Sequence, residues 1–496
     1  MIEGLRLRKL GVQLNNTLAT ASRSESMTMV DRFSDLPIGV THHILSFLNI
    51  RDLTCFSIAS KRCIELYLST PSLDFGDLLP KRTPKGSSHF TCEFRLKLLS
   101  SLDRFLLKRG DNKIKYFRLF WTGHLIKNRD RTPCFCVNEN FRIVNLIHNA
   151  VRCNVEVLDI FLDEKLAFPF SIFLCETLKS LVINMPSVVK TPSVAFSSNL
   201  EYLELMNVEI KDEGFFKWIS CSCKSIKELI LCGLGRIKNI TIESSSLEKF
   251  ELYDGFCTPI HLNISGEKLE TIRVSWRFRS SKGKSLNIFA PKLKYLFWRG
   301  NVMKKANLGK LECVEEASMF LEPKADDFDN LLKVFCSMHR VEYLVINEAT
   351  IKALFSEGGS TQARFNNLSY LEMDIRSFSD ELVPALVSLL RGMPNLCTLY
   401  VGYHSSRDTK SDVGASRFDV EHWKLQHLEF IHQTEEVTIA LSSGSNGIEF
   451  ARYILENAEK LEQMTIIHLP EQSDAVQKLN ESKMMSKATV IFKEDS

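Results

Sequence analysis

The chain has 496 residues, with 63 basic and 60 acidic side chains and a formal net charge of +3. Apolar residues make up 44% and charged residues 25%. This composition is ordinary for a globular protein, and it excludes a histone-like polycation and an acidic disordered chain. No uninterrupted apolar run reaches the roughly 18 residues of a membrane-spanning helix, so we expect no membrane partner.

The first residues lack the apolar core and the small-residue cleavage site of a secretory signal. The fourteen cysteines are scattered, which favours free thiols in a reducing compartment. We therefore expect the protein in the nucleus, the cytoplasm or both. Residues 1–30 have no helical or strand periodicity and are expected to form a disordered tail.

Residues 31–75 have the pattern of three short helices. Pro37 suits a helix start, and Ile44, Leu45 and Leu48 follow at helical spacing. Asn49 is expected to end this helix and Asp52 to begin the next. Three short helices make a poor core alone, so the module is expected to need a partner over its apolar face. Residues 76–95 are polar and are interpreted as a linker.

A repeated pattern, apolar-x-x-apolar-x-apolar, dominates residues 96–424. Between Val155 and Leu425 its copies are 21 to 29 residues apart. A period near 25 predicts one short strand per unit and a returning segment, and stacking the units in parallel buries a continuous α/β core. The fourteen copies begin at Ile114, Val155, Leu178, Leu200, Ile226, Leu247, Leu269, Leu293, Val314, Val341, Leu368, Leu396, Leu425 and Leu461.

Residues 425–470 have a different pattern, with two strand-like runs followed by a helix. Asn446 and Glu449 have the spacing of a capping box at the start of that helix. We interpret the segment as an α/β cap that closes the repeat array, followed by a tail at 471–496.

The order of motifs resembles a known family. D-x-x-S-D-L-P, H-H-I-L-S-F-L, S-K-R and L-D-F in residues 31–75 resemble an F-box, the repeats resemble a leucine-rich-repeat solenoid, and FARYILENAEKLEQMTI resembles the FBD region. Together they are similar to the plant F-box/leucine-rich-repeat proteins. The resemblance implies a three-helix F-box, an irregular solenoid and a carboxy-terminal cap. It also implies docking on a Skp-type adaptor, and through it on a cullin, by Leu36, Pro37, Ile44, Leu45, Leu48 and Leu53. Cys63 stands where the family commonly has Trp.

A second candidate site follows from the repeat register. Positions 3, 5 and 7 of each unit alternate with the core positions and are expected on the concave face. These positions bring together Tyr253, Arg273, Phe297, Arg299 and Phe320. Arginine and aromatic residues are enriched at binding hot spots, so we expect a target protein here. A solvated sheet face with scattered aromatic residues is the alternative.

The stretch from Arg273 to Lys310 holds eleven basic residues and no acidic one. It favours an acidic or phosphorylated protein partner, or an anionic small ligand, over a neutral one. Aromatic residues are interleaved with the basic ones, so nucleic acid is a further candidate partner. Trp298 falls at a core position, which weakens the argument that these aromatic residues stack on bases. A solvated basic surface is the alternative.

Motifs for catalysis, metal binding and cofactor binding are missing. There is no P-loop, and Cys134-x-Cys136 and Cys221-x-Cys223 lack the paired spacing of a zinc module. The family resemblance implies a substrate receptor of a Skp–cullin–F-box ubiquitin ligase, and the missing motifs lead us to expect that it is non-catalytic and needs no cofactor or metal. Two alternatives remain at this point: a repeat protein that senses an anionic small ligand together with a protein, and a nucleic-acid-binding repeat protein with a weak adaptor site.

Overall fold

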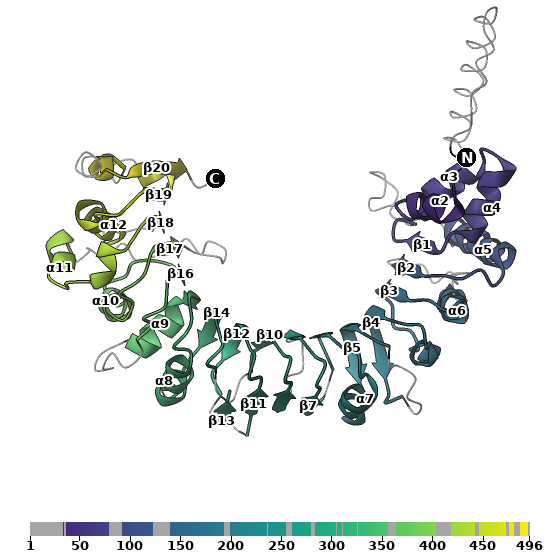
Figure 1. Ribbon diagram of the computed structural model, residues 1–496, viewed down its shortest axis with the longest axis horizontal. Coiled ribbons are helices and arrows are strands. Elements are labelled where there is room, and N and C mark those ends of the chain that lie inside the picture. The colour runs from purple at the N-terminus through teal and green to yellow at the C-terminus, as the bar shows by residue number, and fades with distance from the viewer. Residues whose placement is uncertain are drawn as a thin grey trace, which may run out of the picture.

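The computed structural model describes residues 33, 36–78, 92–122, 139–192, 199–235, 237–253, 260–278, 283–303, 305–309, 311–324, 326–355, 364–402, 418–441, 446–472, 476–480 and 487–494. The tail expected at 1–30 and Cys134-x-Cys136 lie outside these residues. Within them, the chain forms an open arc with strands on its inner side and helices on its outer side (Figure 1). No helix in these ranges is long and apolar enough to cross a membrane.

The inner side of the arc is one parallel sheet of sixteen strands in chain order. Its strands are β1 (Ser72–Phe75), β2 (Tyr116–Trp121), β3 (Val157–Leu162), β4 (Ser180–Val189), β5 (Tyr202–Ile210), β6 (Glu228–Cys232), β8 (Lys249–Tyr253), β10 (Thr271–Trp276), β12 (Tyr295–Asn301), β14 (Glu316–Glu322), β15 (Tyr343–Asn347), β16 (Tyr370–Asp374), β17 (Thr398–Gly402), β18 (Glu436–Ala440), β19 (Gln463–His468) and β20 (Thr489–Glu494). The α/β repeat fold predicted from the sequence is confirmed.

The apolar positions of the repeat explain this sheet. In the unit of β12, Leu293, Leu296 and Trp298 are each 1% exposed, while the alternating side chains face the concave side. The side chains at positions 1, 4 and 6 point into the core of the solenoid. They are buried only when neighbouring units stack with their strands in register. The weak copy at Val314 follows the rule, because Ala317 and Met319 of β14 are fully buried.

The returning segments differ along the arc, and unit length decides which kind forms. From Ile226 to Val314 the copies are 21 to 24 residues apart, and each unit returns through a strand of a second sheet, in the order β13 (Lys305–Asn307), β11 (Ser285–Phe289), β9 (His261–Ser265), β7 (Asn239–Glu243). From Val314 to Leu396 they are 27 or 28 residues apart, and each unit returns through α8 (Phe328–Ser337), α9 (Glu348–Phe355) or α10 (Val383–Arg391). Five strand residues and ten helical residues both span about 15 Å, so about five extra residues replace a strand by a helix.

The second sheet carries a polar ladder that the sequence analysis did not predict. Asn287 donates to the Asn263 side chain at 2.6 Å, and Asn263 donates to Thr241 at 3.2 Å. These bonds join β11, β9 and β7 on the convex side. They link neighbouring units by side-chain hydrogen bonds, as a regular ladder of asparagines would.

The amino-terminal module consists of α2 (Ile38–Leu45), α3 (Ile50–Ser57) and α4 (Lys61–Ser69). Asn49 caps α3 by accepting from the backbone N–H groups of Arg51 and Asp52, so α3 begins earlier than the expected start at Asp52. Ser60 caps α4 in the same way. The last residues of the expected F-box segment, 72–75, form β1, which pairs with β2 and is the first strand of the solenoid.

The module is therefore joined to the solenoid before the expected linker begins. Arg109, at the end of α5 (Cys92–Arg109), is 3% exposed and donates to the carbonyl oxygen of Leu68 in α4 at 3.0 Å. Phe75 of β1 contacts the rings of Phe105 and Phe117. The linker expected at 76–95 stays a prediction, because residues 79–91 lie outside the described ranges, but α4, β1 and α5 on either side of it pack in one core.

The remaining helices lie on the convex side. They are α6 (Glu139–Arg152), α7 (Gly214–Ser222), α11 (Val420–Lys424), α12 (Asn446–Asn457) and the short 3-10 segments η2 (Phe170–Leu174), η3 (Glu429–His432) and η4 (Pro470–Gln472).

The carboxy-terminal end corrects two expectations, at Leu425 and in the expected tail, and it shows one contact between distant units, at Asn446. The copy predicted at Leu425 is not a strand: Leu425 follows α11 and is 71% exposed, and the strand of this unit is β18. Asn446 is 1% exposed, and its side chain bonds the Phe378 carbonyl oxygen and the Asp380 carboxylate of an earlier unit. The tail predicted at 471–496 contains β20, which pairs with β19 and extends the sheet to residue 494.

Candidate functional site

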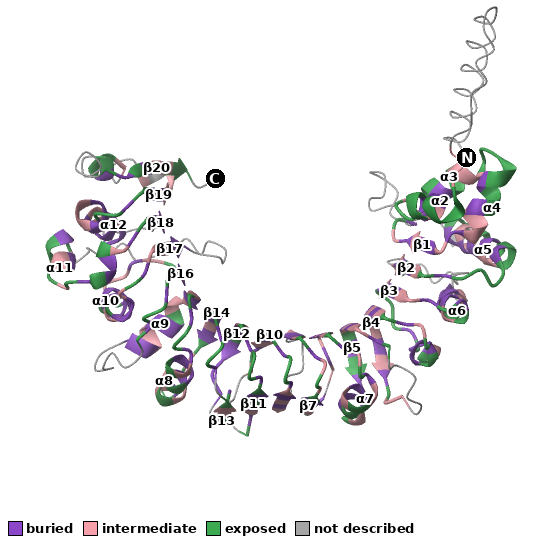
Figure 2. Ribbon diagram, viewed as in Figure 1, coloured by how far each residue is buried: buried purple, intermediate pink, exposed green. Residues whose placement is uncertain are grey.

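Exposed apolar side chains concentrate on the amino-terminal helices. Of the thirteen large apolar side chains that are exposed in the described residues, six lie between residues 38 and 64. Figure 2 colours much of the ribbon around α2 as exposed. We call these six the helical patch: Ile38, Val40, Ile44, Phe47, Ile58 and Ile64. Phe47 and Ile58 are 77% and 81% exposed. Exposed apolar side chains in such number on one small module are typical of an interaction surface.

The helical patch has a local cause in the sequence. Val40, Ile44 and Phe47 are spaced by four and three residues, so they share one side of α2 and the turn after it. The neighbouring side of α2 buries Thr41 and Leu45. The helix therefore has apolar side chains over most of its circumference, and only part of them pack within the chain.

The six residues predicted to bind the adaptor fall into two groups. Ile44 is exposed and belongs to the helical patch. Pro37 is exposed and precedes Ile38 of the patch, and Leu36 is partly exposed. Leu45 and Leu53 are 1% and 0% exposed, so they form the module's core and cannot touch a partner, and Leu48 packs against that core. The prediction is wrong for the buried leucines because helical periodicity alone does not say which apolar side faces inward. For the same reason, the sequence analysis did not single out Val40, Phe47, Ile58 and Ile64, which the structure shows to be exposed.

The second candidate site lies on the concave face at β8, β10, β12 and β14. The register pairs Arg273 with Phe297 and Arg299 with Phe320, as the repeat pattern predicts. Tyr253 pairs with Ser275 on the next strand. We call Tyr253, Arg273, Phe297, Arg299 and Phe320 the concave site. The five residues predicted here are brought together on adjacent strands.

Arg273 is held by its neighbours on the sheet. Its Nε lies 3.4 Å from Oε1 of Glu251, and its guanidinium lies 4.6 Å from the centre of the Tyr295 ring. Glu251 is only 7% exposed; it also pairs with Lys249 at 3.2 Å and accepts from the Tyr253 hydroxyl at 2.8 Å. Burial, together with this hydrogen bond, raises the pKa of Tyr253 to about 12. Lys249 also pairs with Glu228 at 3.4 Å, so these two cations face two carboxylates, and the charge of Arg273 is balanced inside the site.

Arg299 is in a different situation. Its guanidinium lies 5.6 Å from the centre of the Phe320 ring, and the Phe297 and Phe320 rings lie 5.8 Å apart. The residue is exposed, and it makes no ion pair or hydrogen bond within the described part of the chain. Aromatic contact orients its guanidinium without using its N–H donors.

The basic residues between Arg273 and Lys310 that the structure describes do not form one surface. Arg277 pairs with Glu322 and Lys294 pairs with Glu270. Lys284 is 9% exposed and lies over the rings of Trp276 and Phe278. Arg279, Lys282, Lys304 and Lys310 lie outside the described residues. Trp276 and Trp298 are buried, so they offer no stacking surface for nucleic-acid bases.

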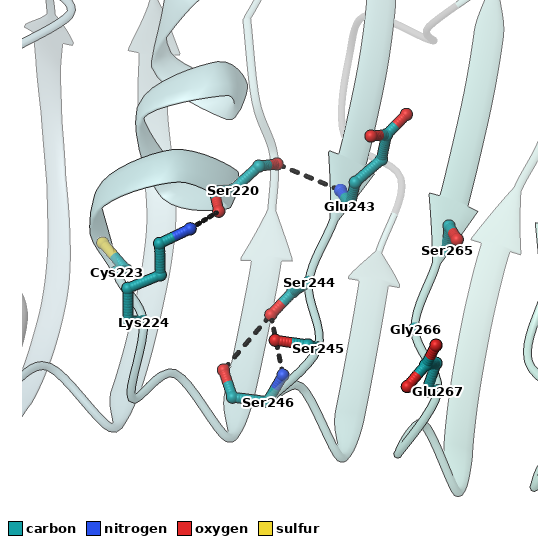
Figure 3. Close-up of a pocket in the computed structure, with 10 residues that line it drawn as sticks. All are labelled: Ser220, Cys223, Lys224, Glu243, Ser244, Ser245, Ser246, Ser265, Gly266 and Glu267. Carbon is teal, nitrogen blue, oxygen red and sulfur yellow. Dashed lines mark hydrogen bonds between the residues drawn. The ribbon is translucent and has the colours of Figure 1, made fainter.

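A cavity of about 280 Å³ lies elsewhere, on the convex side, where α7, β7 and β9 end (Figure 3). Glu243 and Glu267 line it beside Lys224 and several serine residues. The Ser220 hydroxyl accepts from the Glu243 backbone, and the Ser246 hydroxyl donates to the Ile226 carbonyl oxygen. This lining satisfies its own hydrogen bonds and carries two carboxylates against one lysine, so it does not resemble an anion site.

The described residues give no evidence of a metal site or of a reactive thiol. They contain no cluster of three or more side chains that could hold a metal ion. Cys223 is buried, and burial raises the pKa of its thiol to about 12, which makes it an unreactive structural cysteine.

The geometry defines a class of protein: a leucine-rich-repeat solenoid that carries an apolar three-helix module at its amino-terminal end. Comparison with known proteins agrees. Residues 235–494, just over half of the chain, match the family model described as "At1g61320/AtMIF1, LRR domain". The chain belongs to the plant F-box/leucine-rich-repeat family.

Curated relatives match over nearly the whole length. A putative F-box/FBD/LRR-repeat protein of Arabidopsis thaliana, At4g03220, is 26% identical over 471 residues, which cover 88% of this chain and 89% of the relative. The FBD-associated F-box protein At1g66310 of the same plant is 26% identical over 452 residues, covering 88% and 90%. The F-box/LRR-repeat protein At3g62440 is 24% identical over 398 residues, covering 75% and 79%.

Proposed function

We propose that the chain is the substrate-recognition subunit of a Skp–cullin–F-box ubiquitin ligase. The observation that carries the proposal is the helical patch, a group of exposed apolar side chains on a module whose relatives are named for the F-box. Covering such side chains stabilises a complex by about 25 cal/mol for each Å² of apolar area removed from water. A Skp-type adaptor, and through it a cullin, is the partner we assign to this surface.

The mechanism that we propose is positional. The helical patch holds the adaptor, the concave site holds a target protein, and the chain itself makes and breaks no bonds. Holding a target lysine near a ubiquitin-charged enzyme raises its effective concentration. The buried Arg109 and the pairing of β1 with β2 support this view, because they fix the module to the solenoid. We place this function in the nucleus, the cytoplasm or both.

The experiment is co-expression of the chain with a plant Skp-type adaptor and purification through a tag on the chain. We expect the intact chain to recover the adaptor in stoichiometric amount. A chain that lacks residues 31–70 but keeps β1 should recover none. Circular dichroism of the shortened chain serves as the control for folding of the solenoid. Equal recovery of the adaptor by both chains would overturn the proposal.

A sensor of an anionic small ligand is less well supported. That function needs a deep cationic pocket, whereas the cation that remains unbalanced in the concave site, Arg299, is exposed. Binding of nucleic acid is disfavoured by the buried tryptophans and by the ion pairs of Arg277 and Lys294.

A further inference from the structure

The concave site contains two arginines with different roles. Arg273 faces a carboxylate that is almost fully buried, and it lies between the rings of Tyr295 and Phe297, so its position is set by the chain itself. Arg299 has an aromatic contact and no carboxylate. The residues aligned with it on the two neighbouring strands, Ser275 and Phe320, are uncharged. Arg299 is thus the cation of this site that is left to bind an anion from outside.

The surroundings of Arg299 limit the charge of that anion. A phosphate group carries close to two negative charges and is usually held by a cluster of arginines. Here Arg273 is balanced by Glu251, and Arg299 alone provides one positive charge. One guanidinium matches one carboxylate, which it can bind through two parallel hydrogen bonds.

The rings of Phe297 and Phe320 supply the rest of the surface. Their centres lie 5.8 Å apart, with Phe297 on β12, the strand of Arg299, and Phe320 on the adjacent β14, and both rings are on the concave face. An extended segment that crosses β10, β12 and β14 covers about 10 Å, or about three residues. The residues beside the acidic one would therefore contact these rings.

We propose that the concave site binds a short segment of a target protein in which one aspartate or glutamate, flanked by apolar side chains, pairs with Arg299. This rests on the proposed function, in which the concave face holds the target. It differs from the expectation drawn from the basic sequence run, because it assigns a single carboxylate in place of an acidic tract or a phosphorylated residue.

The test is selection of peptides on the intact chain. A phage-displayed library of random 12-residue peptides is selected in parallel on the wild-type chain, on Arg299→Ala and on Lys305→Ala. Lys305 is the matched control, because it is an exposed cation on the convex sheet. We expect wild type and Lys305→Ala to enrich the same peptides, with one acidic residue between apolar ones, and Arg299→Ala to lose them.

Synthetic versions of the enriched peptides are then measured by fluorescence anisotropy. Replacing the acidic residue by its amide, or Arg299 by Ala, should weaken binding about tenfold or more, and Phe320→Ala should weaken it several-fold. Arg299→Glu should regain affinity for a peptide whose acidic residue is changed to Lys. A phosphoserine in place of the acidic residue should bind no more tightly.

Three results would overturn the proposal: no enriched sequence, enriched peptides that are insensitive to Arg299→Ala, or a phosphoserine peptide that binds at least tenfold more tightly. Recovery of the Skp-type adaptor is measured on the same preparations. Arg299→Ala should keep it in full, so failure at the concave site is distinguished from failure of the ligase function.

Discussion

The two candidate surfaces of this chain are built on different principles. The helical patch is made only of aliphatic and phenyl groups, and none of its six members carries a charge. The concave site combines two arginines with three aromatic rings on strands that are hydrogen-bonded to their neighbours in the sheet. The first surface is suited to tight binding through removal of apolar area from water, and the second to selection by charge. The two proposed partners, a constant adaptor and a selected target, would therefore bind to surfaces that differ in chemistry as well as in position.

The largest effect should come from the core under the helical patch. Leu53 was expected at the adaptor interface from the family resemblance, but it is fully buried. Leu53→Ala should therefore lower the free energy of unfolding of the module by about 2–5 kcal/mol. Ile64→Ala, at a residue that is 46% exposed, should change it by no more than about 0.5 kcal/mol. Urea denaturation followed by far-ultraviolet circular dichroism measures both, and equal losses would show that the two surfaces of the module are wrongly assigned.

The next effect concerns the helical patch itself. Phe47→Glu places a charge in an apolar interface and should weaken adaptor binding roughly a hundredfold, or by about 3 kcal/mol. Phe289→Glu is the matched control, since Phe289 is 59% exposed on β11 of the convex sheet. Isothermal titration with purified adaptor measures both variants. Unchanged affinity of Phe47→Glu would remove the helical patch from the interface.

Salt should separate the two surfaces. Exposed charges are screened as the Debye length falls from about 10 Å at 0.1 M to about 3 Å at 1 M, whereas apolar contacts are not. We expect affinity for the selected peptides to fall several-fold over this range of sodium chloride while affinity for the adaptor stays nearly constant. Parallel loss at both surfaces would contradict the distinction between them.

The smallest effect is expected at Gly39. This residue lies in α2, and a Cβ added there meets nothing within 4 Å. Gly39→Ala should therefore raise the stability of the module by about 0.5–1 kcal/mol, because alanine loses less backbone entropy in a helix. Thermal denaturation is the measurement. A decrease in stability would indicate that α2 is not helical at this position in solution.

The length of the repeat units distinguishes two regions of the solenoid. The units of β8, β10 and β12 return through strands, and those of β14, β15 and β16 return through helices, although their concave strands share one sheet. The sequence contains this information in the spacing of its copies, 21 to 24 residues against 27 or 28. The rise per residue of a helix is less than half that of a strand, so the longer units have the residues to return as helices.

The sequence by itself determined the parallel sheet, its register and the neighbours within the concave site. Stacked repeats allow this, because each unit contacts mainly the next one and the apolar spacing of one strand fixes which residues align with it. Thus Arg273 beside Phe297, and Arg299 beside Phe320, follow from counting residues.

Only the tertiary structure decided three other matters. It showed that Leu45 and Leu53 face inward while Phe47 faces solvent, that the segments around β1 and β20 belong to the sheet, and that the described residues of the basic run are largely paired or dispersed. Burial in a three-helix module depends on how helices distant from each other pack, and an ion pair depends on which strands lie side by side. Neither is encoded in local spacing, so neither could be found before the chain was seen folded.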